Sequence, residues 1–398
     1  MTWRNLLLIP LILLGGCSAI SSHNNVDNDV QIERPVSEIN ESQLLDVWIE
    51  LFDPGELQED DDDAKGLSVD IREAEARYMS VLLRDTMERT GYWGAVRVVP
   101  RDTEGGEVLV QGIILESDGE QLELKITALD ATGREWFSST YEAEVSLQAY
   151  QDAELAGKEV FQALFNAIAN DLAVYRATLT ADDILTVRRI AELRFAADLA
   201  PDVFSDYLQR SDDDQFTVVR LPAESDPMVR RVSAIRERDF LLVDTLNGHF
   251  DNFNQTMQEP YAQWRKTRLE ELESLRAIER EARNRKLIGA AAIIGAIAIE
   301  VLGGDSTRAA TGTLRDVMVV GGAYAIKTGF DKDSETTIHR DAIEELGDSF
   351  SAETKPLVVE VEGETHELTG SAEVQYVKWR ALLKQIYAAE TGLPGTVN

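Results

Sequence analysis

The sequence has one cysteine, few histidines and few basic residues, and each shortage excludes a class of site. With Cys17 alone, no disulfide can form within the chain. The chain has 39 lysines and arginines and 72 aspartates and glutamates, which gives a net charge of −33. Phosphate backbones would repel such a chain, so we expect no nucleic-acid partner. No histidine has a second histidine or cysteine at ligand spacing, so no metal site is predicted; the four are His23, His249, His339 and His366.

The common catalytic motifs are also missing. The sequence contains no GxSxG, no P-loop, no GxGxxG after a strand and no HExxH. Four consecutive aspartates at 60–63 lack the alternating ligands, central glycine and closing glutamate of an EF-hand, so we interpret them as part of a mobile loop. We therefore expect a non-enzymatic protein without a cofactor. A hydrolase with dispersed residues is kept as an alternative.

The amino terminus carries the strongest signal that is present. Residues 1–16 contain one positive charge at Arg4, an apolar run at 6–14 and the small residues Gly15 and Gly16. This order is typical of a secretory signal peptide, and the apolar run is too short to span a bilayer. An ordinary signal peptide followed by an incidental cysteine is the alternative interpretation.

The stretch Leu14-Gly15-Gly16-Cys17 resembles the lipobox of bacterial lipoproteins. The resemblance implies cleavage between Gly16 and Cys17 and attachment of acyl chains to Cys17, which would anchor the protein to a membrane. Ser18 stands where an aspartate would imply retention at the inner membrane, so the resemblance implies the periplasmic face of the outer membrane of a Gram-negative bacterium. Residues 17–43 are polar, and we expect a flexible tether there.

The overall pattern predicts an α+β protein whose first folded unit is a small α/β domain at 44–149, with the order β-α-β-β-β. A strand at 44–52 has apolar residues on both faces, and a helix at 68–90 leads to a strand at 95–99. Glycine-containing turns then join further strands as hairpins. Over residues 44–176 this order resembles periplasmic α/β domains such as those of TolB, the curli-pore lipoprotein and lipoprotein activators of cell-wall synthases, which implies an envelope location and no particular activity.

A helical region is predicted at 150–285. The helices expected there cover residues 152–175, 180–197, 229–247 and 259–285. The last of them is rich in glutamate and arginine at spacings of three and four, which stabilises a solvent-exposed helix and favours a projecting coiled-coil arm.

The most apolar part of the mature sequence, 286–330, predicts a Gly/Ala-rich helical hairpin. Its first apolar stretch, 287–302, gives only ~24 Å of helix, against ~30 Å for a bilayer core. Small residues four apart allow close helix packing; they are Ala291, Gly295, Gly321, Ala325 and Gly329. Three interpretations stay open: a soluble packed hairpin, a hairpin that contacts the membrane, and a contact between several copies of the chain.

The carboxyl-terminal part, 331–398, predicts a β-hairpin followed by a helix at 371–391. Taken together, the sequence predicts a lipid-anchored envelope protein that acts through contacts with an unknown periplasmic protein, as a scaffold or as an assembly factor or activator. A membrane-active or homo-oligomeric assembly through the Gly/Ala-rich hairpin is the first alternative, and a cryptic envelope hydrolase is the second.

Overall fold

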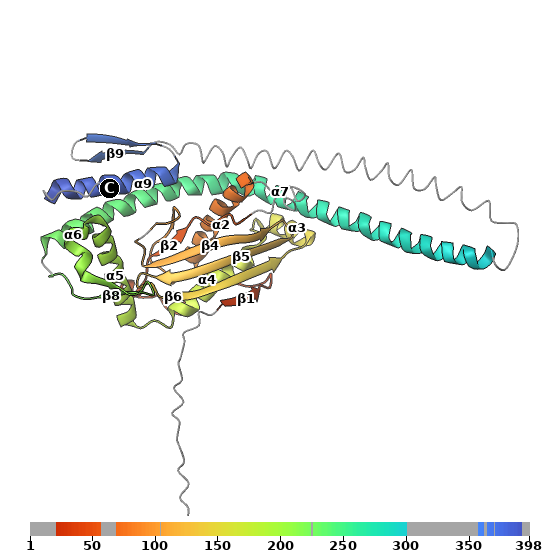
Figure 1. The fold of residues 1–398 in the computed structure, drawn as a ribbon, viewed down its shortest axis with the longest axis horizontal. Coiled ribbons are helices and arrows are strands. Elements are labelled where there is room, and N and C mark those ends of the chain that lie inside the picture. Colours follow the sequence, from red (N-terminus) through yellow and green to blue (C-terminus); the bar gives the residue numbers. More distant parts are fainter. Residues whose placement is uncertain are drawn as a thin grey trace, which may run out of the picture.

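The computed structural model describes most of the chain beyond its first twenty residues. The described ranges are 21–56, 69–103, 105–223, 226–300, 357–361, 364–369 and 371–391. They form the predicted α+β fold: a six-stranded mixed sheet, helices packed against it, one very long helix, and a carboxyl-terminal hairpin and helix (Figure 1).

The sheet has the strand order β1-β6-β5-β4-β2-β3. Its strands are β1 (Ser21–Asn25), β2 (Val47–Glu50), β3 (Val96–Val99), β4 (Val108–Ser117), β5 (Gln121–Asp130) and β6 (Glu135–Glu144). The β4–β5–β6 meander is antiparallel, whereas β2 is parallel to both β3 and β4, and β1 is parallel to β6. Four strands follow the first long helix, one more than the predicted β-α-β-β-β order.

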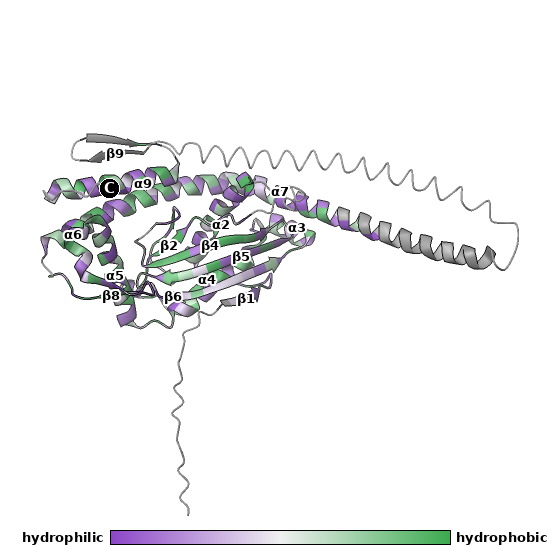
Figure 2. Ribbon diagram, in the orientation of Figure 1, coloured by the Kyte–Doolittle hydropathy of each residue, from purple (hydrophilic) through white to green (hydrophobic). Residues whose placement is uncertain are grey.

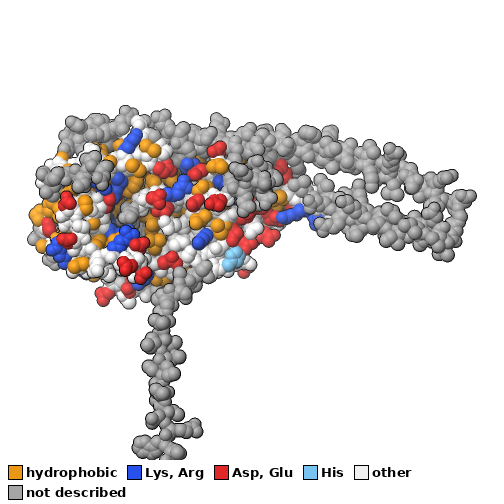
Figure 3. Space-filling model, in the orientation of Figure 1, with side chains coloured by type: hydrophobic (Ala, Val, Ile, Leu, Met, Phe, Trp, Pro, Cys, Tyr) orange, Lys and Arg blue, Asp and Glu red, His pale blue; other side chains and the backbone are white. Residues whose placement is uncertain are grey.

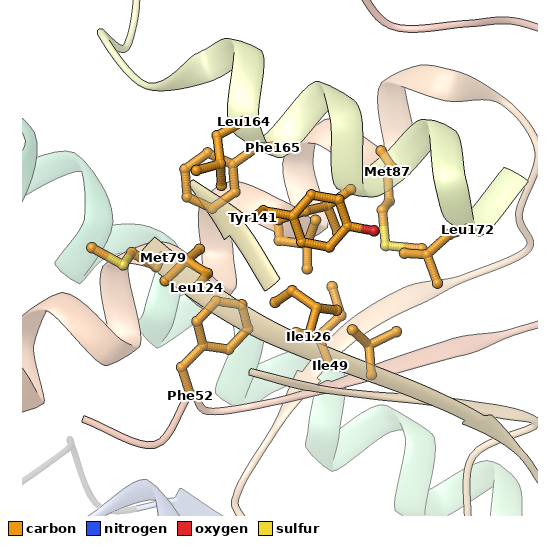
Figure 4. Packing of buried hydrophobic residues seen from close by; sticks show 14 of the residues in the cluster. Ile49, Phe52, Met79, Met87, Leu124, Ile126, Tyr141, Leu164, Phe165 and Leu172 are labelled. Carbon is orange, nitrogen blue, oxygen red and sulfur yellow. The ribbon is translucent and has the colours of Figure 1, made fainter. Parts of the chain in front are cut away.

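Helices cover the sheet where it is apolar, along one face of the β4–β5–β6 meander and on both faces of β2. The shorter helices are α2 (Val69–Thr90), α3 (Leu147–Ala156), α4 (Gln162–Arg176), α5 (Ala181–Leu199) and α6 (Pro201–Phe204). Figure 4 shows α2 and α4 side chains meeting those of the sheet, among them Met79, Met87, Leu124, Ile126, Leu164 and Phe165. A second cluster around Trp48 and Val98 joins β2 and β3 to α5 and to two later helices. A small hairpin, β7 (Leu208–Arg210) and β8 (Phe216–Val218), follows α6.

The predicted tether at 17–43 is wrong for its described part. Ser21–Asn25 forms β1 and pairs with β6, and the chain beyond it makes a turn at Asp27–Val30 and then contacts α4. The side chains of Asn166 and Asn170 donate hydrogen bonds to the carbonyls of Val30 and Gln31, at 2.8 and 2.9 Å. The polar composition predicted a free segment, but asparagine side chains of α4 and the edge of β6 form hydrogen bonds with its backbone.

A single helix, α7 (Pro227–Glu300), replaces the two helices predicted at 229–247 and 259–285. Pro260 lacks the N–H that would bond the preceding turn, yet the helix continues through it. Buried side chains recur at spacings of three and four along this stretch and hold it against the core; they are Phe250, Phe253, Met257, Tyr261 and Trp264. Beyond them α7 projects from the sheet and its covering helices, which together we call the body (Figure 1).

The carboxyl-terminal elements match their prediction. β9 (Leu357–Val361) and β10 (Glu364–Leu368) form an antiparallel hairpin, and α9 (Ala372–Thr391) packs on α7 and α5. Figure 2 shows hydrophobic residues concentrated in the strands and mixed with hydrophilic ones on α7 and α9. Within the described ranges, no helix combines the length and the apolar character that crossing a membrane requires.

The edge strand β3 is covered by a side chain of α7. The amide of Asn247 accepts a hydrogen bond from the N–H of Val98 at 2.8 Å and donates one to its carbonyl at 2.9 Å. Asn247 is buried, and Arg84 of α2 donates to the same amide oxygen at 3.2 Å. One side chain thus takes the place of a neighbouring strand and blocks pairing at this edge.

Glu50 on β2 makes the stability of the sheet depend on pH. Burial raises the pKa of this carboxyl group, against the opposing hydrogen bond from Gln111. Folding therefore favours the protonated form, and the free energy of unfolding falls as pH rises from the usual carboxyl pKa toward the raised value. In Glu50→Gln we expect this fall to be smaller by about 1 kcal/mol, measured by urea unfolding across pH. The exposed Glu135→Gln on β6 is the control; equal pH profiles for both variants would contradict the assignment to Glu50.

Candidate functional site

The candidate site lies where α7 leaves the body, at a cluster of buried polar side chains that we call the root cluster. Its members are Glu75, Tyr78, Ser117, Glu159, Tyr261 and Arg265, from α2, the end of β4, the α3–α4 connection and α7. Five of these six residues are almost wholly buried. The side chain of the sixth, Glu159, is 6% exposed. Polar groups at such depth are stable only when they are paired, so their partners define what the cluster does.

The first half of the root cluster is centred on Glu75. Its carboxylate accepts hydrogen bonds from the hydroxyls of Tyr261 at 2.7 Å and Ser117 at 2.8 Å, and Arg72 lies 3.6 Å away. Burial raises the pKa of Glu75, although the charge of Arg72 and the two hydroxyl bonds oppose this. Glu75 therefore joins α2, the sheet and α7 at one point.

The second half is the ion pair between Arg265 and Glu159. The Arg265 guanidinium lies 2.7 and 3.0 Å from the two carboxylate oxygens, and the Tyr78 hydroxyl donates to the same carboxylate at 2.8 Å. The guanidinium also stacks 4.1 Å from the centre of the Tyr261 ring. Burial lowers the pKa of Arg265, but Glu159 and the surrounding tyrosines together raise it by more, so the net shift is upward and the cation is strongly held.

The turn between β4 and β5 is held against α7 at the same place. Gly119 has φ +94°, and a Cβ there would lie 2.5 Å from the carbonyl oxygen of Arg265, so the close approach requires glycine. The Tyr150 hydroxyl donates to the Gly119 carbonyl at 2.6 Å. About three turns further along α7, Arg276 donates to both carboxylate oxygens of Glu120, each at 2.6 Å.

The geometry of the root cluster fits a mechanical role. Its hydroxyls donate to its carboxylates, and the remaining oxygen of Glu75, which has no hydrogen bond, lies 3.6 Å from the Arg72 guanidinium. Within the described residues, no group of three or more histidine, cysteine, aspartate or glutamate side chains could hold a metal ion. The cluster fixes the direction in which α7 leaves the body.

A hollow of about 910 Å³ lies beside the root cluster and shares Tyr78 and Glu159 with it. Its walls come from segment 28–34, from α2, from α3 and α4 with the connection between them, and from α7. Acidic and basic side chains are interspersed on the face drawn in Figure 3, with acidic ones gathered near the point where α7 leaves the body.

The residues predicted from the sequence lie away from this site or outside the described ranges. Ala291 and Gly295 lie in α7, beyond the ion pair at Arg276. The other predicted residues fall outside the described chain: Gly16, Cys17, Gly321, Ala325 and Gly329. Their predicted roles in cleavage, lipidation and helix packing therefore stay predictions.

Sequence reasoning missed the root cluster. One local signal was available, because Glu75 interrupts the apolar face of the helix predicted at 68–90, between Ala74 and Ala76. Its partner Tyr261 is 186 residues away and gave no corresponding signal. Comparison of the chain with protein families, with curated proteins and with solved structures finds no match.

Proposed function

We propose that this protein is a non-enzymatic, lipid-anchored envelope protein that presents a rigid helical arm to a protein partner in the periplasm. The observation that carries the proposal is the continuity of α7. The arm, residues 277–300, extends α7 by ~36 Å past the Arg276–Glu120 ion pair while remaining one helix with the part packed in the core. A rigid projection fixed by a buried polar cluster suits a scaffold or assembly role.

The distribution of perturbed groups supports a structural role. Glu75 and Asp239 are buried carboxyl groups with raised pKa values, as expected for candidate catalytic acids. Each, however, connects helices: Glu75 joins α2 to α7, and Asp239 joins α7 to α9. Their environments are accounted for by packing, so a hydrolase gains no support from them.

Lipidation at Cys17 would place the body close to the bilayer. β1 begins at Ser21, four residues after Cys17, and four extended residues span at most ~14 Å. The β1–β6 edge would then lie beside the membrane surface, and the distance to a partner would be covered by the arm.

Replacing Cys17 with serine tests the anchor. We expect Cys17→Ser to move from the membrane fraction to the soluble fraction when cells are fractionated, because the acyl chains supply the membrane affinity. Mass spectrometry of the native protein should show an acylated amino-terminal Cys17. A variant that folds normally by circular dichroism and still sediments with membranes would overturn the lipid-anchor proposal.

The alternative, self-assembly through the Gly/Ala-rich segment, is favoured because α7 continues as one helix past the Arg276–Glu120 ion pair into residues 291 and 295, where small residues stand four apart. If small residues on the arm allow close contact between copies, Gly295→Leu should reduce crosslinked oligomers of the full chain. Gly248→Leu is the matched control, since Gly248 lies on the same helix, is exposed and has no atom within 4 Å of an added Cβ. Equal crosslinking in both variants would count against assembly through the arm.

A further inference from the structure

The hollow beside the root cluster carries a row of unused amides. Asn254, Gln255 and Gln258 of α7 line it, at helix positions three and four apart that lie on one side of the helix. None of the three side chains has a hydrogen bond within the described structure, and the side-chain oxygen of Asn254 is buried without a partner. An unpaired buried acceptor costs free energy, so a ligand donor at this position would be favoured.

The fold already uses amides of this kind to hold extended main chain. Asn247 binds both backbone groups of Val98. Asn170 donates to the carbonyl of Gln31 and accepts from the N–H of Glu33 at 2.8 Å, on the segment that forms one wall of the hollow. An extended peptide is therefore the ligand shape that the amide row on α7 is suited to bind.

The charges of the hollow favour an anionic ligand. Two of its acids have a cationic partner within the fold: Glu159 pairs with Arg265, and Asp85 pairs with Arg84, which Asp251 shares. The third acid, Asp152, accepts a hydrogen bond from Gln148. Its three cations, Arg34, Arg89 and Lys158, have no ion pair in the described structure. In a chain of net charge −33, three lining cations without an ion pair in the described structure stand against one such acid, Asp152, and these cations are complementary to carboxylates.

The apolar part of the lining favours a peptide over a sugar. Val30, Ile32, Leu82 and Val160 offer aliphatic surface for side chains. The one aromatic lining residue, Tyr78, is 2% exposed and gives no open ring face for a sugar to stack on. The volume of about 910 Å³ lies within the ~300–1,000 Å³ of ordinary ligand pockets.

We propose that the hollow binds an extended acidic peptide segment of a partner protein. The amides of α7 would hold its main chain, and Arg34, Arg89 and Lys158 would pair with its carboxylates. This inference rests on the proposed partner-binding function, because it names the chemistry of a partner that the anchored body would recruit.

Fluorescently labelled hexapeptides of alternating glutamate and valine are the probe, tested by anisotropy against the full chain in detergent. We expect saturable binding that weakens with salt, and much weaker binding of hexapeptides in which glutamine replaces glutamate. The exposed double variant Arg34→Gln/Lys158→Gln should lose about tenfold in affinity. Gln258→Ala should weaken the glutamate and glutamine peptides by the same factor, since it contacts the main chain.

Lys125→Gln is the matched control, because Lys125 is an exposed cation on β5 outside the hollow. Equal loss of affinity in Lys125→Gln and in the double variant would overturn the proposal by showing non-specific attraction. Binding of a neutral N-acetylglucosamine hexamer in preference to the peptides would overturn it in favour of a glycan. Cell fractionation of Cys17→Ser reports on the anchor independently, so a failed peptide site and a failed lipid anchor give different results.

Discussion

Replacing Arg265 with methionine is expected to lower the free energy of unfolding of the body by about 3–5 kcal/mol. The substitution keeps most of the side-chain volume but leaves the carboxylate of Glu159, which is 6% exposed, without its cation. It also removes the stacking on Tyr261. Urea unfolding followed by tryptophan fluorescence would measure the loss directly, because Trp264 is buried one residue away.

The adjacent residue provides the control for this prediction. Lys266 pairs with Glu154 at 3.0 Å in an ion pair whose side chains are 25% and 59% exposed, so Lys266→Met should cost no more than about 1 kcal/mol. Adding Glu159→Gln to Arg265→Met should recover much of the stability, because the buried charge is then removed as well. Similar losses for Arg265→Met and Lys266→Met would show that the buried pair does not hold α7 to the body.

The second large effect is expected at α9, where Arg380→Met should weaken the docking of the carboxyl-terminal helix. Arg380 donates to Asp239 at 3.0 Å and to Asp198 at 2.6 Å, and its guanidinium lies 4.7 Å from the centre of the Phe195 ring. Asp239 is fully buried, so losing its cation should cost about 3–5 kcal/mol. Hydrogen exchange of residues 372–391 should rise sharply, because α9 then opens before the body unfolds.

The same variant should depend on pH. Burial raises the pKa of Asp239 and the charge of Arg380 opposes this, so removing Arg380 raises the pKa further. Because the protonated carboxyl group costs little to bury, the deficit of Arg380→Met should be smaller at about pH 5 than at about pH 8. Lys384→Met, which removes the exposed partner of Asp198 at 2.9 Å, should show neither the large loss nor the pH dependence. A deficit that is constant with pH would contradict the role given to Asp239.

Helices and strands were predicted correctly where periodicity and the residues at their ends determine the structure. The helix predicted at 68–90 is Val69–Thr90, and the strand predicted at 95–99 is Val96–Val99. Ser371 precedes the helix Ala372–Thr391, and its hydroxyl accepts from the N–H of Val374 at 3.4 Å, as expected of the predicted cap. In each case periodicity and a cap or turn residue mark the element, and the surrounding fold agrees with them.

Two elements were missed because tertiary contacts overrule local preference. β1 has the sequence Ser-Ser-His-Asn-Asn, which lacks β-branched and aromatic residues, and it forms because the edge of β6 offers unpaired backbone groups. α7 continues through Pro260 because Met257 and Trp264 on either side are buried in the core. The root cluster was hidden for the same reason, since Glu75 and Tyr261 meet only after α7 has crossed α2.

The antiparallel packing of α9 on the amino-terminal half of α7 has a consequence for how the molecule can change in evolution. The chain leaves the body along α7 and is back on it at β10 and α9, so the residues between Arg276 and β10 are inserted between elements that belong to one core. Each added or deleted heptad of helix in α7 beyond Arg276 would change the length of the arm by ~10 Å. The core would not need to be redesigned, so the length of the arm can be adjusted separately from the stability of the body.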